Sequence, residues 1–330
     1  MKAKLQVAGC KLPVSQNRAT RKTFNFQPSA FNPFAFTLIE LLVVISIMGL
    51  LAALAVPALK NLGKSNSQTS AARQLLDDVG RARQLAISQH TTVYMVFVPT
   101  NFFNLPCVYN GTPYPNLYPS GINAIPLAAD QVAAMTALTN LVDKQLSGYN
   151  FISYGRVGDQ PGRHAWHYLS DWQALPDGTF IAAAKFQPAA SFAPLSIPLW
   201  LSDYAGQIDN YWRGALPQIY AFTNASQLIP FPTEQSPGVL LPCLAFDSTG
   251  RLISETTGNG VYHHAYIPLA QGSVSFSLDP ATKRPIIPAT PLQPGDITEI
   301  PAGNSASISY NVIDVDPLSG RAKLLVHQIP

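Results

Sequence analysis

The sequence predicts an α+β protein in which a long N-terminal helix packs on a mainly antiparallel β-sheet domain. Three observations support this fold class. Residues 36–59 form an apolar block, residues 70–90 repeat apolar side chains with the period of a helix, and short runs beyond residue 149 alternate apolar and polar residues. We therefore expect the helix to have a membrane-spanning half and an amphipathic half.

The composition excludes several classes of protein. The chain has 330 residues, 47% of them hydrophobic and only 12% charged. Its 21 Gly and 29 Pro residues are too few for a disordered low-complexity chain or a collagen. Its three Cys residues are too few for a disulfide-dense miniprotein. A chain of this length can bury one large core or two ordinary ones.

The first 35 residues are the most basic part of the chain. They contain six Lys and Arg residues and no acidic residue, although the net charge of the whole chain is only +3. Residues 36–59 follow, and the stretch 41–59 carries no charged side chain. As a helix this block would be about 36 Å long, enough to cross a hydrocarbon core of about 30 Å. The basic side is expected to stay in the cytoplasm while the remainder is exported.

A plain secretory signal is the main alternative for this segment. The sequence from Ala53 to Ala55 is a small-x-small site that signal peptidase can cut before Val56. Two features argue against it: the apolar run is longer than the usual core of about 7–15 residues, and it carries Glu40 at its leading edge. A carboxylate within a membrane segment costs up to about 3 kcal/mol. Glu40 is therefore expected to have a partner or to be solvated at the cytoplasmic edge.

The sequence AFTLIELLVV at residues 35–44 resembles the prepilin cleavage and methylation motif of type IV pilins and type II secretion pseudopilins. The resemblance implies that a prepilin peptidase cuts between Ala35 and Phe36 on the cytoplasmic side and then N-methylates Phe36. It also implies that Glu40, at the fifth mature position, pairs with the N-terminal amine of a neighbouring subunit. The apolar helix would remain attached as the assembly stalk.

Further positions can be compared with the same family. Gly49 and Pro57 fall where the family places its helix-loosening Gly and Pro, and Pro57 is expected to kink or melt the helix locally. Ala35 stands where the family usually has Gly, which is expected to slow processing, and the leader is longer than most. Loss of that leader changes the formal net charge from +3 to −3. The mature chain therefore has no general electrostatic reason to bind nucleic acid.

Residues 60–91 are expected to continue the helix beyond the membrane, as an amphipathic segment laid on the globular domain. The apolar positions that recur at helical spacing are Leu75, Val79, Ala82 and Ala86. The arginines on or beside the polar side are Arg73, Arg81 and Arg83, and a solvated face is the simplest interpretation of them. The junction with a strand at residues 92–98 resembles the H-type minor pseudopilins and the FimT-like minor pilins.

Residues 92–330 are expected to form an exported β-rich domain, pilin-like by the same resemblance, with an insertion at about 99–235. The Pro-rich residues 99–126 are interpreted as an extended surface excursion and residues 127–146 as a second helix. Strands are predicted at residues 92–98, 151–154, 178–181, 218–222, 239–246, 274–278 and 308–315. Two similar hairpin turns, at 246–252 and 315–321, each begin with Asp and are closed by Gly.

The chain shows no motif of an enzyme, a nucleotide-binding loop or a cofactor site, so no catalytic residue and no cofactor are expected. His164 with His167, and His263 with His264, have spacings that zinc can use, but surface or packing roles are favoured and no metal site is predicted. Four Trp and thirteen Tyr residues leave a sugar-binding surface as an alternative to ordinary core roles.

Two cysteines remain after loss of the leader, which contains Cys10. Export permits oxidation of Cys107 and Cys243 to a disulfide. The alternative is two buried free thiols, because the sequence cannot place their Cα atoms within bonding range.

Two classes of function follow. The first is a pilin-like structural subunit, a minor pseudopilin or minor pilin, that is anchored in the bacterial inner membrane with its N-terminus cytoplasmic and its globular domain periplasmic. Its expected partners are prepilin peptidase, other pilin or pseudopilin subunits through the N-terminal helix, and the inner-membrane assembly platform, with no nucleic acid. The second is an exported binding protein, for example for carbohydrate, or a hydrolase that uses residues 1–55 only as a signal.

Overall fold

A computed structural model describes residues 37–117, 134, 136–160, 164–186, 221–253, 263–288, 292–305 and 311–326, without the side chains of residues 53–66, 294 and 326. The chain divides into two compact units, residues 1–55 and residues 56–330. The first unit contains the beginning of helix α1 (Leu38–Gln89), and the second contains the remainder of α1 and every strand described.

The part of α1 in the second unit is amphipathic. Its wholly buried positions are Ala71, Ala72, Leu75, Val79, Ala82 and Ala86. All four positions predicted from the helical period are in this set, so the predicted apolar face is confirmed. Between these positions Arg73, Asp77 and Arg81 are exposed to solvent.

The first sheet has the strand order β10-β1-β4-β5, with β6 also paired to β4, and all of its pairs are antiparallel. Its strands are β1 (Val93–Phe97), β4 (Gly148–Tyr154), β5 (Trp166–Tyr168), β6 (Gln173–Ala174) and β10 (Cys243–Phe246). Met95 of β1 lies between Phe151 of β4 and Leu244 of β10. β1 is therefore a central strand, and each of its residues is buried.

The second sheet has the order β12-β11-β13-β14, with β7 also paired to β11. Its strands are β7 (Thr179–Ile181), β11 (Ala265–Val274), β12 (Ile297–Glu299), β13 (Asn311–Val315) and β14 (Ala322–Val326). The sequence predicts no strand over residues 265–273, and Pro268 lowers the strand preference of this segment. The Pro268 carbonyl accepts a hydrogen bond from the Ala182 backbone N–H at 3.0 Å. Ala182 lies opposite Pro268, one residue beyond the end of β7, and the return bond of this pair is absent because proline has no N–H.

The third sheet has the order β3-β2-β9-β8 and consists of short strands. They are β2 (Cys107–Tyr109), β3 (Thr112–Tyr114), β8 (Ile229–Pro230) and β9 (Gly238–Val239). Within the described residues, four short 3-10 helices connect strands: η1 (Phe102–Asn104), η2 (Val142–Lys144), η3 (Ala183–Phe186) and η5 (Pro294–Asp296).

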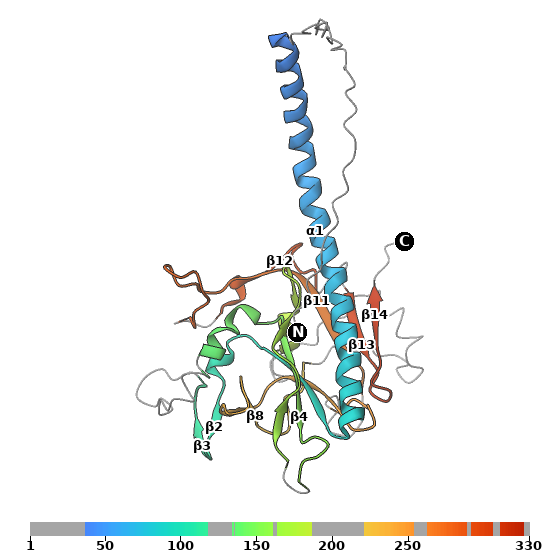
Figure 1. Ribbon diagram of the computed structural model, residues 1–330, viewed down its shortest axis with the longest axis vertical. Helices are drawn as coiled ribbons and strands as arrows, with labels where there is room; N and C mark the ends of the chain where they lie inside the picture. The colour runs from blue at the N-terminus through green and yellow to red at the C-terminus, as the bar shows by residue number, and fades with distance from the viewer. Residues whose placement is uncertain are drawn as a thin grey trace, which may run out of the picture. The chain divides into compact units, whose positions relative to one another are not determined.

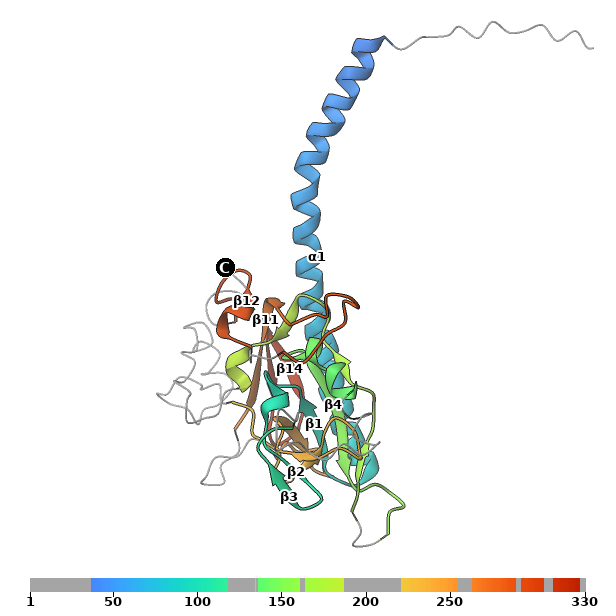
Figure 2. The same ribbon diagram turned by 90° about the vertical axis from the view of Figure 1, so that its left-hand side faces the viewer.

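Two hydrophobic cores lie on opposite faces of β1. Val93, Met95 and Phe97 belong to the core that α1 covers together with β4, β11 and β13. Tyr94 and Val96 belong to the other core, which is shared with the third sheet. Figure 1 shows β13 and β14 beside the last part of α1, and Figure 2 shows β1 and β4 from the adjacent side. The expected α+β arrangement, a helix packed against antiparallel sheets, is confirmed.

Several predicted elements differ from the structure. The described part of the expected surface excursion, residues 99–117, contains η1, β2 and β3, and Phe102, Phe103 and Leu117 are buried in the second core. The excursion is wrong here because its aromatic residues supply core volume. Of the second helix, residues 134 and 136–139 are helical, and residues 127–133 lie outside the described residues.

The remaining differences concern strands. Pro242 follows the end of β9, so the predicted strand at 239–246 is divided into β9 and β10. The strand predicted at 274–278 is wrong, because β11 ends at Val274 and only Leu278 forms an isolated bridge. Ala221 and Phe222 are not in a strand, and the rest of that predicted strand, residues 218–220, lies outside the described residues.

Candidate functional site

The first turn of α1 holds the carboxylate singled out in the sequence. Thr37 precedes the helix, and its carbonyl accepts the hydrogen bond of the Leu41 N–H at 3.2 Å. The Thr37 hydroxyl accepts a bond from the Glu40 N–H at 3.3 Å and donates one to the Glu40 carboxylate at 3.5 Å. The bond from the Glu40 N–H to the Thr37 hydroxyl is one half of a capping box, with Thr at the N-cap and Glu three residues later. Glu40 thus has a partner within its own chain, which the T-x-x-E spacing could have indicated.

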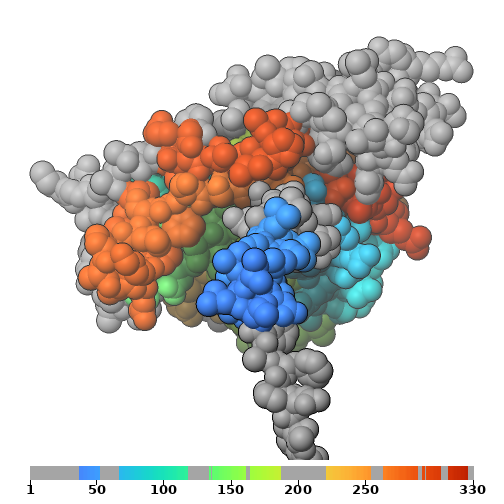
Figure 3. Space-filling model, turned by 90° about the horizontal axis from the view of Figure 1, so that it is seen from above, coloured from blue at the N-terminus to red at the C-terminus, as the bar shows by residue number. Residues whose placement is uncertain are grey.

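The helix that follows is apolar around its whole circumference. Every large apolar side chain between Leu38 and Leu51 is at least 40% exposed, up to 82% for Leu38. The Ser46 hydroxyl in this stretch donates to the Leu42 carbonyl at 2.8 Å, so even this polar group is satisfied within the helix. The space-filling view shows these side chains, in blue, at the surface (Figure 3). A helix that is apolar all round requires a non-aqueous environment or a covering partner.

The other motif residues lie before or within this segment. Ala35 and Phe36 lie outside the described residues. Gly49 is exposed, and a Cβ added there would meet nothing within 4 Å. Helix α1 is assigned without a break at Pro57, so the local melting expected there does not appear in the secondary structure. Loss of one donor removes a single bond of the helical ladder, and the neighbouring bonds can maintain the helix.

The described part of the chain contains no helix that meets the requirements of length and apolarity for crossing a membrane. The predicted span, residues 36–59, is only partly within that set, because Phe36 and the side chains of residues 53–59 lie outside it.

A buried polar network joins the second part of α1 to the first sheet. The Tyr149 hydroxyl donates to the Asp78 carboxylate at 2.5 Å and accepts a bond from the Gln74 amide at 2.7 Å. Burial raises the pKa of the Asp78 carboxyl, although the bond from Tyr149 opposes the shift. Burial and the neighbouring Asp78 also raise the pKa of Tyr149. The network satisfies polar groups at the helix–sheet interface.

The two predicted turns are confirmed, and they pack against each other. Asp247 and Asp316 each accept backbone N–H bonds within their turns, and Gly250 and Gly320 adopt φ values of +83° and +62°. The Nε of Arg83 on α1 donates to the Ser319 carbonyl at 2.7 Å. A solvated role is therefore wrong for Arg83, because it joins the helix to the turns.

Arg73 and Arg81 remain at the solvent-exposed surface of α1. The Arg81 guanidinium lies 5.4 Å from the centre of the Phe151 ring. Its exposed charge therefore also contacts the aromatic surface of β4.

The histidine pairs do not form a shared site. His167 contacts Asp159 at 3.1 Å, whereas His164 packs on the Tyr154 ring. His264 contacts the buried Asp314 at 2.7 Å. Among the residues that the structure describes, no group of three or more His, Cys, Asp or Glu side chains could hold a metal ion.

The two remaining cysteines are buried thiols, so the disulfide considered for Cys107 and Cys243 is not formed. Cys107 lies in the third sheet and Cys243 in the first. The Cys107 sulfur contacts the Asn116 backbone carbonyl at 3.7 Å. The Cys243 sulfur contacts the Thr223 backbone carbonyl, also at 3.7 Å. Burial raises the pKa of the Cys107 thiol, which disfavours the reactive thiolate.

The described tryptophans have packing roles. Trp166 and Trp172 are partly buried against the second core, and the Trp172 indole N–H donates to the Pro232 carbonyl at 3.0 Å. Trp200 and Trp212 lie outside the described residues. The described rings therefore do not form the exposed platform that a sugar-binding surface requires.

Comparison with known protein families matches the N-terminal segment. The family described as Prokaryotic N-terminal methylation motif matches residues 33–56. No curated protein and no solved structure shows a significant match to the chain. The matched residues include Glu40 and the apolar first part of α1. The chain therefore carries the N-terminal methylation motif of the type IV pilin and pseudopilin family.

Proposed function

We propose that the mature chain is a minor pseudopilin or minor pilin that is assembled into a type II secretion pseudopilus or a type IV pilus-like filament. The observation that carries this proposal is the coincidence of the matched motif, residues 33–56, with the start of the exposed apolar helix. The motif implies a structural protein, processed by prepilin peptidase and anchored in the inner membrane with an extracytoplasmic domain.

The finer assignments rest on the chemistry of the motif residues. The peptidase cuts between Ala35 and Phe36, and Phe36 becomes the methylated N-terminus. Glu40 then pairs with the N-terminal amine of a neighbouring subunit, because a carboxylate on an otherwise uncharged helix gains most from a cationic partner. Gly49 and Pro57 let the helix adjust as subunits pack together, on the inner-membrane assembly platform and within the filament.

The globular domain supplies specificity. The proposed insertion at about 99–235 supplies β2, β3 and β8 of the third sheet, but also β4 to β6 of the first sheet and β7 of the second. We therefore confine the proposed added module to the third sheet. Added surface segments of this kind commonly carry recognition.

A strain with and without prepilin peptidase tests the proposal, together with two Glu40 variants. Without the peptidase, the full-length precursor should remain in the membrane. Glu40→Leu should be processed but should not enter the sheared filament fraction. Glu40→Gln keeps an oxygen that can accept the Thr37 bond but loses the charge, so it separates helix capping from pairing between subunits.

The outcomes are distinct. Both Glu40 variants should fail in assembly if the charge pairs with a neighbouring amine. Normal assembly of Glu40→Gln would assign Glu40 to capping alone. A precursor that matures normally without the peptidase would favour the alternative, an exported binding protein cut before Val56.

A further inference from the structure

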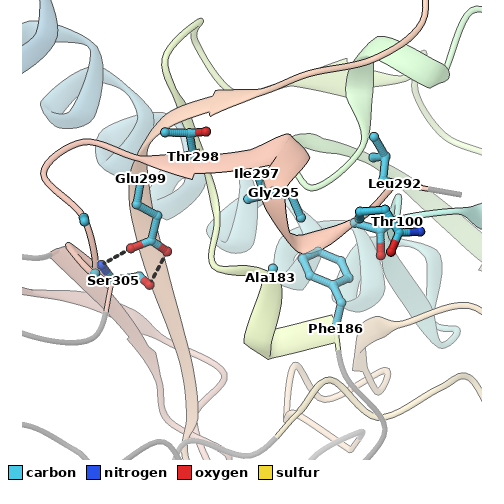
Figure 4. Close-up of a pocket in the computed structure, with 12 residues that line it drawn as sticks. Thr100, Ala183, Phe186, Leu292, Gly295, Ile297, Thr298, Glu299 and Ser305 are labelled. Carbon is cyan, nitrogen blue, oxygen red and sulfur yellow. Dashed lines mark hydrogen bonds between the residues drawn. The ribbon is translucent and has the colours of Figure 1, made fainter.

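A pocket in the second unit lies apart from the N-terminal motif. It has a volume of about 680 Å³, which is within the range of about 300–1,000 Å³ typical of small-ligand sites. The residues that define its chemistry are Thr100, Phe186, Leu292, Ile297, Glu299 and Ser305. Figure 4 shows Glu299 and Ser305 at one end, and Leu292 and Thr100 at the other, with Phe186 and Ile297 between them.

One charged side chain lines this pocket. The Glu299 carboxylate accepts bonds from the Ser305 N–H at 3.0 Å and from the Ser305 hydroxyl at 2.5 Å. Both donors are neutral, so they fix the position of the carboxylate without balancing its charge. In the part of the chain that the structure describes, no Lys or Arg forms an ion pair with Glu299. The pocket therefore combines one negative end with largely apolar walls.

Side-chain hydrogen bonds hold both ends of the pocket in place. Asn304, beside Ser305, accepts a bond from the Gln271 N–H of β11 at 2.9 Å. At the other end the Asn101 amide accepts from the Leu292 N–H at 2.6 Å and donates to the Leu292 carbonyl at 3.3 Å. The buried Gln145 accepts from the Asn101 N–H at 2.7 Å. Because these anchors join segments distant in sequence, the pocket is preformed, which lowers the cost of ordering on binding.

We propose that this pocket binds a ligand that carries a cationic nitrogen group on a compact apolar body, with the cation at Glu299 and the body against Phe186 and Ile297. A charge-assisted hydrogen bond to a fixed carboxylate orients the cation. The apolar walls select a flat or branched body and disfavour strongly hydrated ions. The globular domain would thereby recognise an exported molecule independently of the N-terminal helix.

Three probes of one shape test the charge requirement on the full chain in detergent. Benzamidine is cationic, benzamide is neutral and benzoate is anionic, and their dissociation constants can be measured by ligand-observed NMR. Benzamidine should bind at least tenfold more tightly than benzamide, and benzoate should not bind. Glu299→Gln should abolish this preference while leaving benzamide binding unchanged, which also shows that the pocket remains folded.

A second carboxylate gives the matched control. Glu234 accepts a backbone bond from the Tyr168 N–H at 3.0 Å and does not line the pocket, so Glu234→Gln should retain the preference for benzamidine. Phe186→Ala should weaken benzamidine and benzamide equally. Equal affinities in the unmodified chain, a preference that survives Glu299→Gln, or no binding of benzamidine would each overturn the proposal.

Discussion

Two parts of one helix, residues 38–52 and residues 67–89, differ in the burial of their apolar side chains. In the first part every large apolar side chain from Leu38 to Leu51 is at least 40% exposed. In the second part the apolar side chains Leu75 and Val79 are wholly buried, and the exposed positions include Arg73 and Asp77. The apolar side chains of the second part are covered by the protein's own core. Those of the first part require a covering partner or a non-aqueous environment. The comparison separates residues that should affect stability from residues that should affect assembly.

The largest expected effect on stability comes from replacing one leucine in each part of the helix. Leu75→Ala removes a wholly buried side chain from the core and should lower the free energy of unfolding by about 2–5 kcal/mol. Leu42→Ala, at a position 53% exposed, should change it by less than about 0.5 kcal/mol. Denaturant unfolding of both variants in detergent measures the difference. Similar losses at the two positions would contradict the division of the helix.

The next effect concerns the two packed turns. In Gly320→Ala the new Cβ would lie 2.0 Å from the Gly250 carbonyl oxygen, and Gly320 has a φ of +62°. The expected loss of stability is about 2–4 kcal/mol, from left-handed strain plus displacement of the turn. Gly111→Ala is the matched control, because Gly111 has a φ of +78° but open space around it. The difference between their melting temperatures isolates the contact between the turns.

A third prediction is a stabilising change in the second part of the helix. Gly80 lies within α1, and a Cβ there would meet nothing within 4 Å. Gly80→Ala should therefore raise the free energy of unfolding by about 0.5–1 kcal/mol through helix propensity. Gly49→Ala makes the same chemical change in the first unit and should not alter the unfolding of the second. Thermal unfolding checks both, and destabilisation by Gly80→Ala would show that an unrecognised contact requires the glycine.

The smallest effect depends on pH. The folded-state pKa of Asp78 is raised above its ordinary value of 3.8, so the protonated carboxyl stabilises the fold. That stabilisation is present below the unfolded pKa and is lost as the pH rises through the folded pKa. Asp78→Asn should stay neutral and be more stable than the unmodified chain at pH 7, by less than about 1 kcal/mol because of solvent screening.

The free energy of unfolding, measured from pH 3 to pH 8, tests the direction of this pH dependence. The advantage of Asp78→Asn should vanish at the acidic end of the range. Asp77→Asn, at the exposed neighbouring position, should leave most of the pH dependence in place. A loss of stability at pH 7 would mean that the ionised Asp78 carboxylate contributes more through the Tyr149 bond than its burial costs.

Local pattern was enough to predict much of this fold. The buried positions of α1 follow from helical spacing, and both Asp–Gly turns follow from the conformations that those residues favour. Local pattern does not indicate β11, since Pro268 lowers the strand preference of its segment and the pairing with β7 ends next to it. Phe102 and Phe103 were placed at the surface because the many prolines around them gave no sign of the second core.

The functional features also differ in how far local sequence predicts them. The N-terminal motif is contiguous in sequence, so it could be recognised without a structure, although Thr37 as the partner of Glu40 was overlooked. Arg83 reaches a turn 236 positions away, and no local spacing indicates such a contact. The pocket around Glu299 is likewise built from segments that the fold alone brings together.

The mature N-terminus distinguishes a processed prepilin from a chain with an ordinary secretory signal. The chain should be purified from cells that contain prepilin peptidase, and its N-terminal peptide should be identified by mass spectrometry. A peptide that begins with N-methylated Phe36 is the expected result, since the motif matches residues 33–56. A mature chain that begins at Val56 would rule out the proposed pilin-like subunit, because removal of residues 36–55 would discard Glu40 and the apolar helix on which assembly depends.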